Sequence, residues 1–225
     1  MSDVETRGPI DLQESAPQLV ATKEGLALHG DGMLLRADFA KSLNRLKPGK
    51  LQQELLVKAA KVKGCQIPLA VDATAGLGED ALLLAAAGFE VWMFERDAVI
   101  AALLRDALGR ALADERLASV AARMTLFEED SLNALPCLDR QPQVVVLDPM
   151  FPARTKSASV GKKFQLLQQL EQPCFDEEEL LEAAYAAHPR KIVIKRPLKG
   201  PFLAGKKPSY SLRGKAIRYD CISLP

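Results

Sequence analysis

The sequence predicts an α/β fold in which a Rossmann-like, doubly wound and mostly parallel sheet ends in an antiparallel C-terminal hairpin, with a small β element before it. Apolar strand-like runs alternate with helix-like segments from about residue 69 to residue 195. The run Val144–Leu147 is wholly apolar, as expected of a central parallel strand that is covered on both faces. A glycine turn, Gly76 to Gly78, follows the first strand and joins it to a helix.

Length and composition fit one large domain with a small appendage. The chain has 225 residues, of which 48% are hydrophobic and 26% charged. We predict that residues 1–50 form a small N-terminal β-hairpin element with a basic loop and that residues 51–225 form the sheet domain. The start of the chain has no apolar signal segment and its apolar runs are short, so we expect a cytoplasmic protein with no membrane partner. The four cysteines lack paired spacing, which predicts neither a disulfide framework nor a metal site.

The residues before the main sheet predict short strands and one helix. Leu26–Leu28 and Met33–Leu35 flank a His-Gly-Asp-Gly turn, which is typical of a hairpin, and Leu19–Val20 is a candidate third strand. The stretch from 41 to 50 contains lysines, a proline and a glycine, so we expect a basic loop. Apolar residues then recur at helical spacing from 51 to 62.

The main domain is predicted to continue as alternating strands and helices. Gly88 is a helix end signal, Asp97 is a good N-cap, and Asp176 is expected to cap a later helix. These signals predict helices at 80–87, at 97–113 and after 176, strands at 91–94, 124–127, 144–147 and 191–195, and a closing hairpin of 210–213 with 216–221.

The turn after the first strand has the character of a nucleotide-binding loop. Gly76 and Gly78 let the backbone turn sharply and let a ligand approach closely, and the helix that follows points free N–H groups at it. The Gly-x-Gly-x-x-Ala pattern fits NAD. Asp72 favours S-adenosylmethionine (SAM) instead, because a carboxylate repels pyrophosphate and attracts an α-ammonium group. Glu79 and Asp80 also disfavour a phosphate, so we favour SAM over NAD and over a plain turn without a ligand.

Polar residues follow the neighbouring strands, at the edge where such sheets bind ligands. Glu95 ends the second strand, where a carboxylate can accept hydrogen bonds from both hydroxyls of a ribose. Arg96 is placed to lie over an adenine or to pair with an acid of the turn. Asp130 suits the exocyclic amine of adenine, with Ser131 as a nearby hydrogen-bonding group. Taken singly, Arg96 and Ser131 fit ordinary loop polarity equally well.

The sequence Asp148-Pro149-Met150-Phe151 follows the most apolar strand and predicts the chemistry. A carboxylate at Asp148 and the carbonyl of Pro149 can hold the two N–H groups of a base amine, which aims its lone pair at a methyl donor. Phe151 can stack on a flipped-out base. Methyl transfer from a sulfonium needs no metal. The alternative is that the prolines only end a strand and that Phe151 belongs to the core.

Positive charge is concentrated in the last third of the chain. Residues 1–153 hold 16 Lys and Arg against 22 Asp and Glu, whereas residues 154–225 hold 14 against 7. Scattered solvated lysines explain this imbalance as well as an RNA-binding patch does. Clustering beside the predicted site favours contacts with RNA phosphates, for which the candidates are Lys156, Lys162, Lys163, Lys195 and Arg196.

Several blocks in this order resemble the RsmJ family, whose members are SAM-dependent methyltransferases that modify the exocyclic N2 of a guanine in small-subunit (16S) ribosomal RNA. The resemblance runs from about Leu26 to the C-terminus. The family usually has arginine where Glu79 stands, which implies that Glu79 contacts SAM through its backbone, and a loop lysine is replaced by Gly161. The blocks are Asp72-Ala-Thr-Ala-Gly-Leu-Gly, Phe94-Glu-Arg, Leu147-Asp-Pro-Met-Phe-Pro, Lys156-Ser-Ala and Val193-Ile-Lys-Arg-Pro.

The resemblance implies a class I SAM-dependent methyltransferase that acts on small-subunit ribosomal RNA or on an assembling 30S subunit. It implies SAM contacts from Glu79-Asp80, Glu95-Arg96, Asp130-Ser131 and Asp148. Three other hypotheses remain open: an RNA-binding protein with a relic SAM pocket, a methyltransferase for another nucleic-acid amine, and an NAD-dependent oxidoreductase. An NAD-dependent oxidoreductase should not need Asp72, and the sequence offers no proton relay for such an enzyme. The oligomeric state is not predicted.

Overall fold

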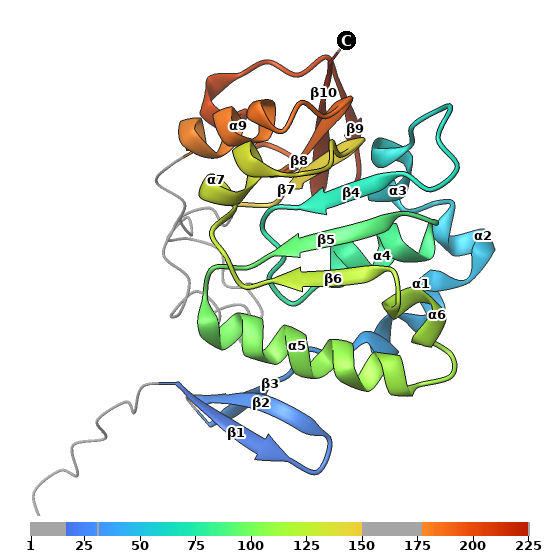
Figure 1. The fold of residues 1–225 in the computed structure, drawn as a ribbon, viewed down its shortest axis with the longest axis vertical. Helices are drawn as coiled ribbons and strands as arrows, with labels where there is room; N and C mark the ends of the chain where they lie inside the picture. Colours follow the sequence, from blue (N-terminus) through green and yellow to red (C-terminus); the bar gives the residue numbers. More distant parts are fainter. Residues whose placement is uncertain (1–16, 31, 150–176, 225) are drawn as a thin grey trace, which may run out of the picture.

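Two β-sheets of different size organise the chain (Figure 1). The computed structural model describes residues 17–30, 32–149 and 177–224. The larger sheet has seven strands in the order β6-β5-β4-β7-β8-β10-β9, in which β6 to β8 pair in parallel and β10 is antiparallel to both of its neighbours. The predicted sheet with a terminal hairpin is therefore confirmed. Its strands are β4 (Leu69–Asp72), β5 (Glu90–Phe94), β6 (Met124–Phe127), β7 (Val144–Leu147), β8 (Lys191–Pro197), β9 (Tyr210–Arg213) and β10 (Ile217–Ser223).

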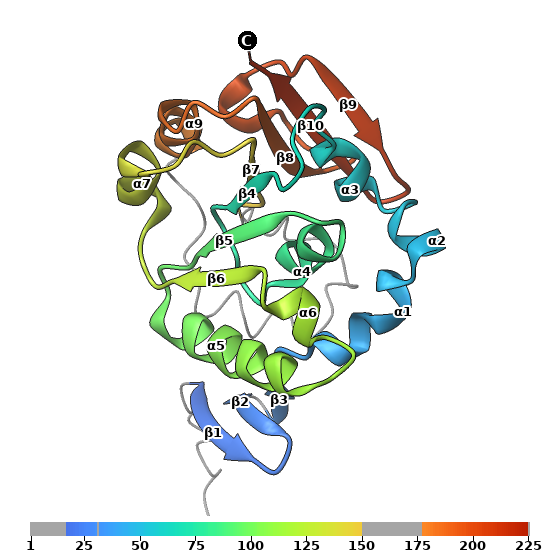
Figure 2. The same cartoon turned by 45° about the vertical axis from the view of Figure 1, so that its right-hand side comes forward.

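Helices cover both faces of the large sheet, and alternate residues of each strand face one layer or the other. Ala70 and Val146 pack with α3, α4, α5 and α6, whereas Val71 and Val145 pack with α7, η2 and α9. Figure 2 shows α7 and α9 lying together, away from α3 and α4. The helices of this domain are α3 (Leu55–Ala60), α4 (Glu79–Ala86), α5 (Ala98–Ala113), α6 (Ala118–Ala121), α7 (Ser131–Ala134) and α9 (Glu177–Ala186), with the short turns η2 (Leu135–Cys137) and η3 (Leu203–Gly205).

Local sequence signals explain where these elements begin and end. Asp97 caps α5, because its carboxylate accepts hydrogen bonds from the backbone N–H groups of Val99 and Ile100. Gly88 follows the end of α4 with a φ of +101°, a conformation that favours glycine. All four residues of β7 are buried, as predicted for a central strand. The helix cap predicted at Asp176 lies outside the described residues.

The predicted N-terminal β element is a three-stranded antiparallel sheet of β1 (Gln18–Thr22), β2 (Gly25–Gly30) and β3 (Met33–Leu35). Leu28 and Leu35 of this sheet pack against Leu103 of α5, and Figure 1 shows the sheet beside that helix. Phe39, further along, already belongs to the core of the large domain. The domain boundary at residue 50 stays a prediction, and the position of Phe39 favours a boundary nearer residue 36.

Two local expectations are wrong. The predicted basic loop of residues 41–50 is mostly helical, since it contains parts of η1 (Phe39–Ser42), α1 (Leu43–Leu46) and α2 (Pro48–Leu51). Pro48 occupies the first position of α2, where its missing N–H costs nothing. The helix predicted for 51–62 is interrupted at residues 52–54, because Glu54 has an extended backbone and its carboxylate binds Arg45 of α1 through two hydrogen bonds of 2.8 and 3.0 Å.

Candidate active site

Three charged side chains meet at the carboxyl ends of three adjacent strands. Asp72 ends β4, Asp148 follows β7, and Lys195 lies near the end of β8, all on the face that α4 covers. The Lys195 ammonium donates to Asp148 Oδ2 at 2.7 Å and to Asp80 Oδ2 at 2.9 Å. Asp80 belongs to the first turn of α4. We call Asp72, Asp80, Asp148 and Lys195 the carboxylate cluster.

Burial and mutual repulsion shape the ionisation of the carboxylate cluster. Burial, reinforced by the charge of Asp80, raises the pKa of Asp72 to about 8. Burial also raises the pKa of Asp148, against the opposing effect of the Lys195 ammonium. Burial alone would lower the pKa of Lys195, but the carboxylates of Asp148 and Asp80 outweigh it and hold that pKa above its usual range. Three acids thus share one cation, and the cluster favours an added positive charge.

The glycine turn stands beside the carboxylate cluster. Gly76 and Gly78 have φ values of +53° and +77°. A Cβ on Gly78 would lie 2.6 Å from Leu104 Cδ1, so this position needs glycine for packing, whereas a Cβ on Gly76 would meet open space among the described residues. Thr74 fixes the turn to the strand end, because its hydroxyl accepts the backbone N–H of Asp148 at 2.7 Å.

Glu95 closes the other side of the turn. Its Oε2 accepts the backbone N–H of Gly76 and its Oε1 accepts that of Asp97, each at 2.9 Å. Burial raises the pKa of Glu95, and the two N–H bonds oppose that shift. Each carboxylate oxygen has a second lone pair. Glu95 therefore retains acceptor capacity for a ribose while being oriented by the backbone.

Arg96, Asp130 and Ser131 lie one and two strands further along the same edge. The Arg96 guanidinium lies 3.6 Å from Asp130 Oδ2, so Arg96 pairs with this acid and not with an acid of the turn. Asp130 Oδ1 caps α7 by accepting the backbone N–H of Leu132. Ser131 is buried in the first turn of that helix.

The structure gives the predicted RNA contacts different surroundings. The Lys195 ammonium is bound to two carboxylates, and the Arg196 side chain is fully buried, with hydrogen bonds to Glu177 and to the carbonyl of Pro201. These partners compete with an RNA phosphate for both side chains, and the two RNA contacts stay predictions. Lys156, Lys162 and Lys163 lie outside the described residues, as do Met150 and Phe151, whereas Pro149 is buried directly after Asp148.

The sequence did not predict the roles that Thr74 and Lys195 have in this site. Thr74 gave no signal beyond its place in the turn. Lys195 was assigned to RNA, yet a lysine that follows the buried run Ile192-Val193-Ile194 within one strand is a sign of an inward-facing partner. Glu79, by contrast, has a well exposed side chain, and its carboxylate lies 3.9 Å from Arg45.

The donor set of this edge fits SAM and does not fit a dinucleotide. Asp72, Asp80 and Asp148 lie at the strand ends beside the turn, where ionised acids repel a pyrophosphate and favour a cation. Glu95 fits a ribose, and the open space before Gly76 leaves room for a ligand. Within the described ranges, no group of three or more His, Cys, Asp or Glu side chains is arranged to hold a metal ion.

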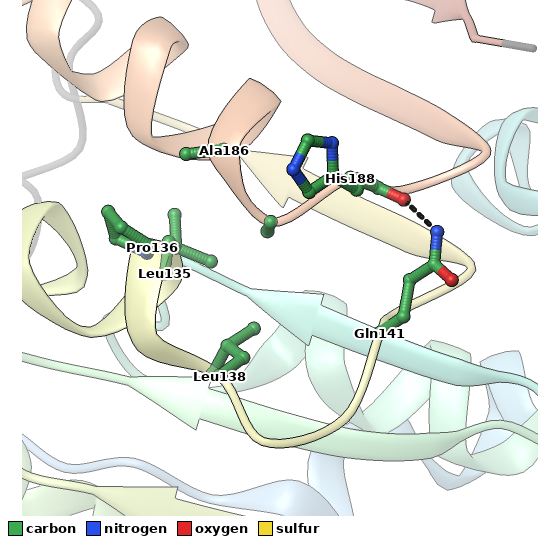
Figure 3. A pocket seen from close by; sticks show the side chains of 7 residues that line it. Leu135, Pro136, Leu138, Gln141, Ala186 and His188 are labelled. Carbon is green, nitrogen blue, oxygen red and sulfur yellow. Dashed lines mark hydrogen bonds between the residues drawn. The ribbon is translucent and has the colours of Figure 1, made fainter.

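A pocket lies near the amino ends of β7 and β8 (Figure 3). It is lined by Leu135 and Leu138 near η2 and by Ala186 and His188 at the end of α9, and the Gln141 amide donates to the His188 carbonyl beside it. Residues 141 and 188 precede β7 and β8, so this pocket is remote from the carboxylate cluster and contains none of the predicted site residues.

No helix of the described residues is long and apolar enough to cross a membrane.

Comparisons with known proteins agree with this geometry. A family model described as "Putative SAM-dependent methyltransferase" matches residues 6–223. The chain is 43% identical over 216 residues to ribosomal RNA small subunit methyltransferase J of Chromohalobacter salexigens, which covers 92% of this chain and 84% of that protein. It is 45% identical over 189 residues to the protein of the same name from Pseudomonas aeruginosa, with 83% and 72% covered.

A solved structure is also similar over nearly the whole chain. The crystal structure of a SAM-dependent methyltransferase from Neisseria gonorrhoeae superposes with a TM-score of 0.76 at 30% identity, and the match covers 98% of this chain and 86% of that one. The fold of this chain is therefore that of a SAM-dependent methyltransferase.

Proposed function

The chain belongs to the SAM-dependent methyltransferase family that includes ribosomal RNA small subunit methyltransferase J. We propose that it methylates the exocyclic N2 amine of a guanine in small-subunit (16S) ribosomal RNA. The observation that carries the proposal is the position of Asp148. Its carboxylate stands at the end of a central strand, beside the glycine turn, where Lys195 binds the carboxylate and Thr74 accepts the backbone N–H of the same residue. We propose a cytoplasmic location, where this RNA is assembled into subunits.

The residues for SAM follow from the charges of the site. SAM supplies an activated methyl group on a sulfonium, whose sulfur keeps the electron pair of the broken bond. Asp72 and Asp80 are placed to attract its α-ammonium, and Glu95 to accept hydrogen bonds from its ribose hydroxyls. Gly76 leaves the space through which the ligand approaches the backbone. Asp130 and Ser131 stay candidates for the adenine.

Asp148 and Pro149 would orient the acceptor amine. A guanine N2 carries two N–H donors, and a carboxylate oxygen together with the strand-end carbonyl offers two acceptors. With both protons held, the nitrogen lone pair points away from the base ring and is free to form the new N–C bond. The nitrogen must then lose one proton, for which the Asp148 carboxylate or water is available. Phe151 as a stacking partner for the base stays a prediction.

Exposed basic residues at the same edge support an RNA substrate. Lys199 follows β8, and Lys215 lies in the turn between β9 and β10, which the pairing of Ile217 with Pro197 brings to the carboxyl end of β8. Both residues are exposed. We propose that they contact phosphates beside the target base, together with the predicted contacts Lys156, Lys162 and Lys163.

The experiment that tests this function is transfer of a tritiated methyl group from SAM. The purified chain is incubated with small-subunit ribosomal RNA, with assembled small subunits and with large-subunit RNA as a control. We expect label in one of the two small-subunit substrates and background counts in the control. Background counts in both small-subunit substrates would refute the proposal, while calorimetric heat with SAM would still report the cofactor site.

A further inference from the structure

We propose that Lys195 is a positioning residue, whose ammonium holds the Asp148 carboxylate in the orientation and the ionised state in which it accepts hydrogen bonds from the target amine. This role differs from the RNA contact predicted from the sequence. The proposal rests on the proposed function, because it is Asp148 that is expected to grip the amine.

The geometry of Lys195 is that of a side chain directed inward. Lys195 lies in β8 beside the end of β7, since Ile194, the residue before it, is in register with Leu147. Its ammonium lies 2.7 Å from Asp148 Oδ2 and 2.9 Å from Asp80 Oδ2, and only 25% of its side chain is exposed. One oxygen of Asp148 is thus fixed by a charge-assisted hydrogen bond, which sets the direction of the other.

The charges around Asp148 explain why a cation is needed there. Without Lys195, Asp148 would share a partly desolvated site with two further carboxylates, and burial already raises its pKa. A protonated Asp148 would offer the amine a donor where an acceptor is required. The ionisable groups whose charges act on Asp148 or on its partners are Asp72 of β4, Asp80 of α4, Lys195 and Arg196 of β8, Tyr219 of β10 and Arg45 of α1.

The same strand provides a matched control. Lys191 lies on the same face of β8 as Lys195 and is also partly buried, but its ammonium donates to the backbone carbonyls of Ala59 and Lys61, each at 2.8 Å. Lys191 therefore shares the residue type, strand and layer of Lys195 and has no carboxylate partner among the described residues. Lys191→Met removes a partly buried lysine without disturbing the carboxylate cluster.

The test is the titration of the Asp148 carboxyl group in the cofactor-free protein. Carboxyl ¹³C shifts of labelled aspartate are followed against pH in the wild type, Lys195→Met and Lys191→Met, with the Asp148 signal assigned by its loss in Asp148→Asn. We expect Lys195→Met to raise the pKa of Asp148 by at least about one unit and Lys191→Met to leave it unchanged. An unchanged Asp148 titration in Lys195→Met would overturn the proposal.

Kinetics then separate positioning from phosphate binding. Lys195→Met should lower kcat by about 100-fold, because the acceptor is misplaced, and should leave SAM and RNA affinity within about threefold, since removing a cation does not weaken attraction for SAM. Lys195→Arg should restore part of kcat and also guards against a misfolded methionine variant. A loss of RNA affinity with kcat unchanged would overturn the proposal. A wild type inactive on ribosomal RNA would refute the substrate only, because the titration needs none.

Discussion

Lys195 and Arg196 are consecutive residues of β8, and their side chains enter two charge networks on opposite faces of the sheet. On the α4 side, Lys195 pairs with Asp80 and Asp148 of the carboxylate cluster, at an edge that solvent reaches. On the α9 side, Arg196 and Arg218 are both buried, and their partners are Glu177, Asp220 and a row of backbone carbonyls. We call this second set the arginine network.

The arginine network has the properties of a structural element. The Arg218 guanidinium contacts both oxygens of Asp220 and donates to the carbonyls of Pro197, Leu198, Gly200 and Pro201, at distances from 2.8 to 3.2 Å. It therefore fixes the loop that follows β8. Two guanidinium groups face two carboxylates here, whereas acids outnumber the cation in the carboxylate cluster.

This difference separates function from stability within a single strand. A network whose charges are matched has little to offer a ligand, whereas a network with excess acid is ready to receive a cation. Substitutions in the carboxylate cluster should therefore change activity more than folding, and substitutions in the arginine network should do the reverse.

The largest effect is expected for Asp148→Ala. Loss of the acceptor should lower methyl transfer by about 1000-fold, in the range seen when an oriented group that stabilises a transition state is removed. SAM affinity and the urea midpoint should change little, because this side chain is 38% exposed. Single-turnover transfer and calorimetry measure the two quantities. A variant that loses SAM binding in proportion to its rate would contradict the role given to Asp148.

Arg218→Met should have the largest effect on folding. It leaves Asp220 buried without its cation and four carbonyls without their donor, so the free energy of unfolding should fall by about 3 kcal/mol. Arg213→Met is the matched control, since Arg213 is exposed on β9 opposite Arg218 and should change stability by less than about 0.5 kcal/mol. Urea denaturation of both variants gives the comparison. Equal losses would mean that the network is not the source of stability.

Glu95→Ala tests the part of the site that is proposed to bind the ribose of SAM. This variant removes a carboxylate that orients the Gly76 and Asp97 N–H groups and is placed for a ribose, so SAM affinity should fall by about 30-fold. The rate at saturating SAM should fall much less than it does in Asp148→Ala. If the two variants lost affinity and rate in the same ratio, the separate roles of these carboxylates would be disproved.

The most gradual effect concerns pH, because it accumulates over about two pH units. Burial raises the pKa of Asp72 to about 8, so this acid binds a proton near pH 7, and a bound α-ammonium would favour its ionised form. SAM affinity should therefore rise between pH 6 and 8, by at most about tenfold per unit, and level off above that range. Asp72→Asn should abolish this slope. Calorimetry in two buffers of different ionisation enthalpy should detect proton release in the wild type, and its absence would contradict the assignment.

Much of this arrangement could be predicted because strand ends in a parallel sheet share one edge. The apolar run before Asp148 and the glycine turn after Asp72 were enough to place both acids at that edge. The single helical turns between residues 39 and 51 could not be predicted, because elements of four residues show no periodicity and Pro48 with Gly49 favours a loop.

The partners of charged residues were the least predictable part. Nothing in the sequence brings Lys195 to Asp80, which lies 115 residues earlier, and only the order of β4, β7 and β8 in the sheet makes them neighbours. Arg196 was predicted to contact RNA phosphates for the same reason, because its partners could not be identified from the sequence. Its burial depends on Glu177 and on the loop after β8, which are tertiary partners.

The identity of the methylated atom tests the central claim most directly. Small-subunit ribosomal RNA is methylated by the wild-type chain, digested to nucleosides and analysed by mass spectrometry against standards. The amine grip assigned to Asp148 predicts N2-methylguanosine as the product, formed about 1000-fold more slowly by Asp148→Ala. Methyl groups found on a ring nitrogen or on a ribose oxygen would contradict it, because neither acceptor carries the two N–H donors for which this strand end is suited.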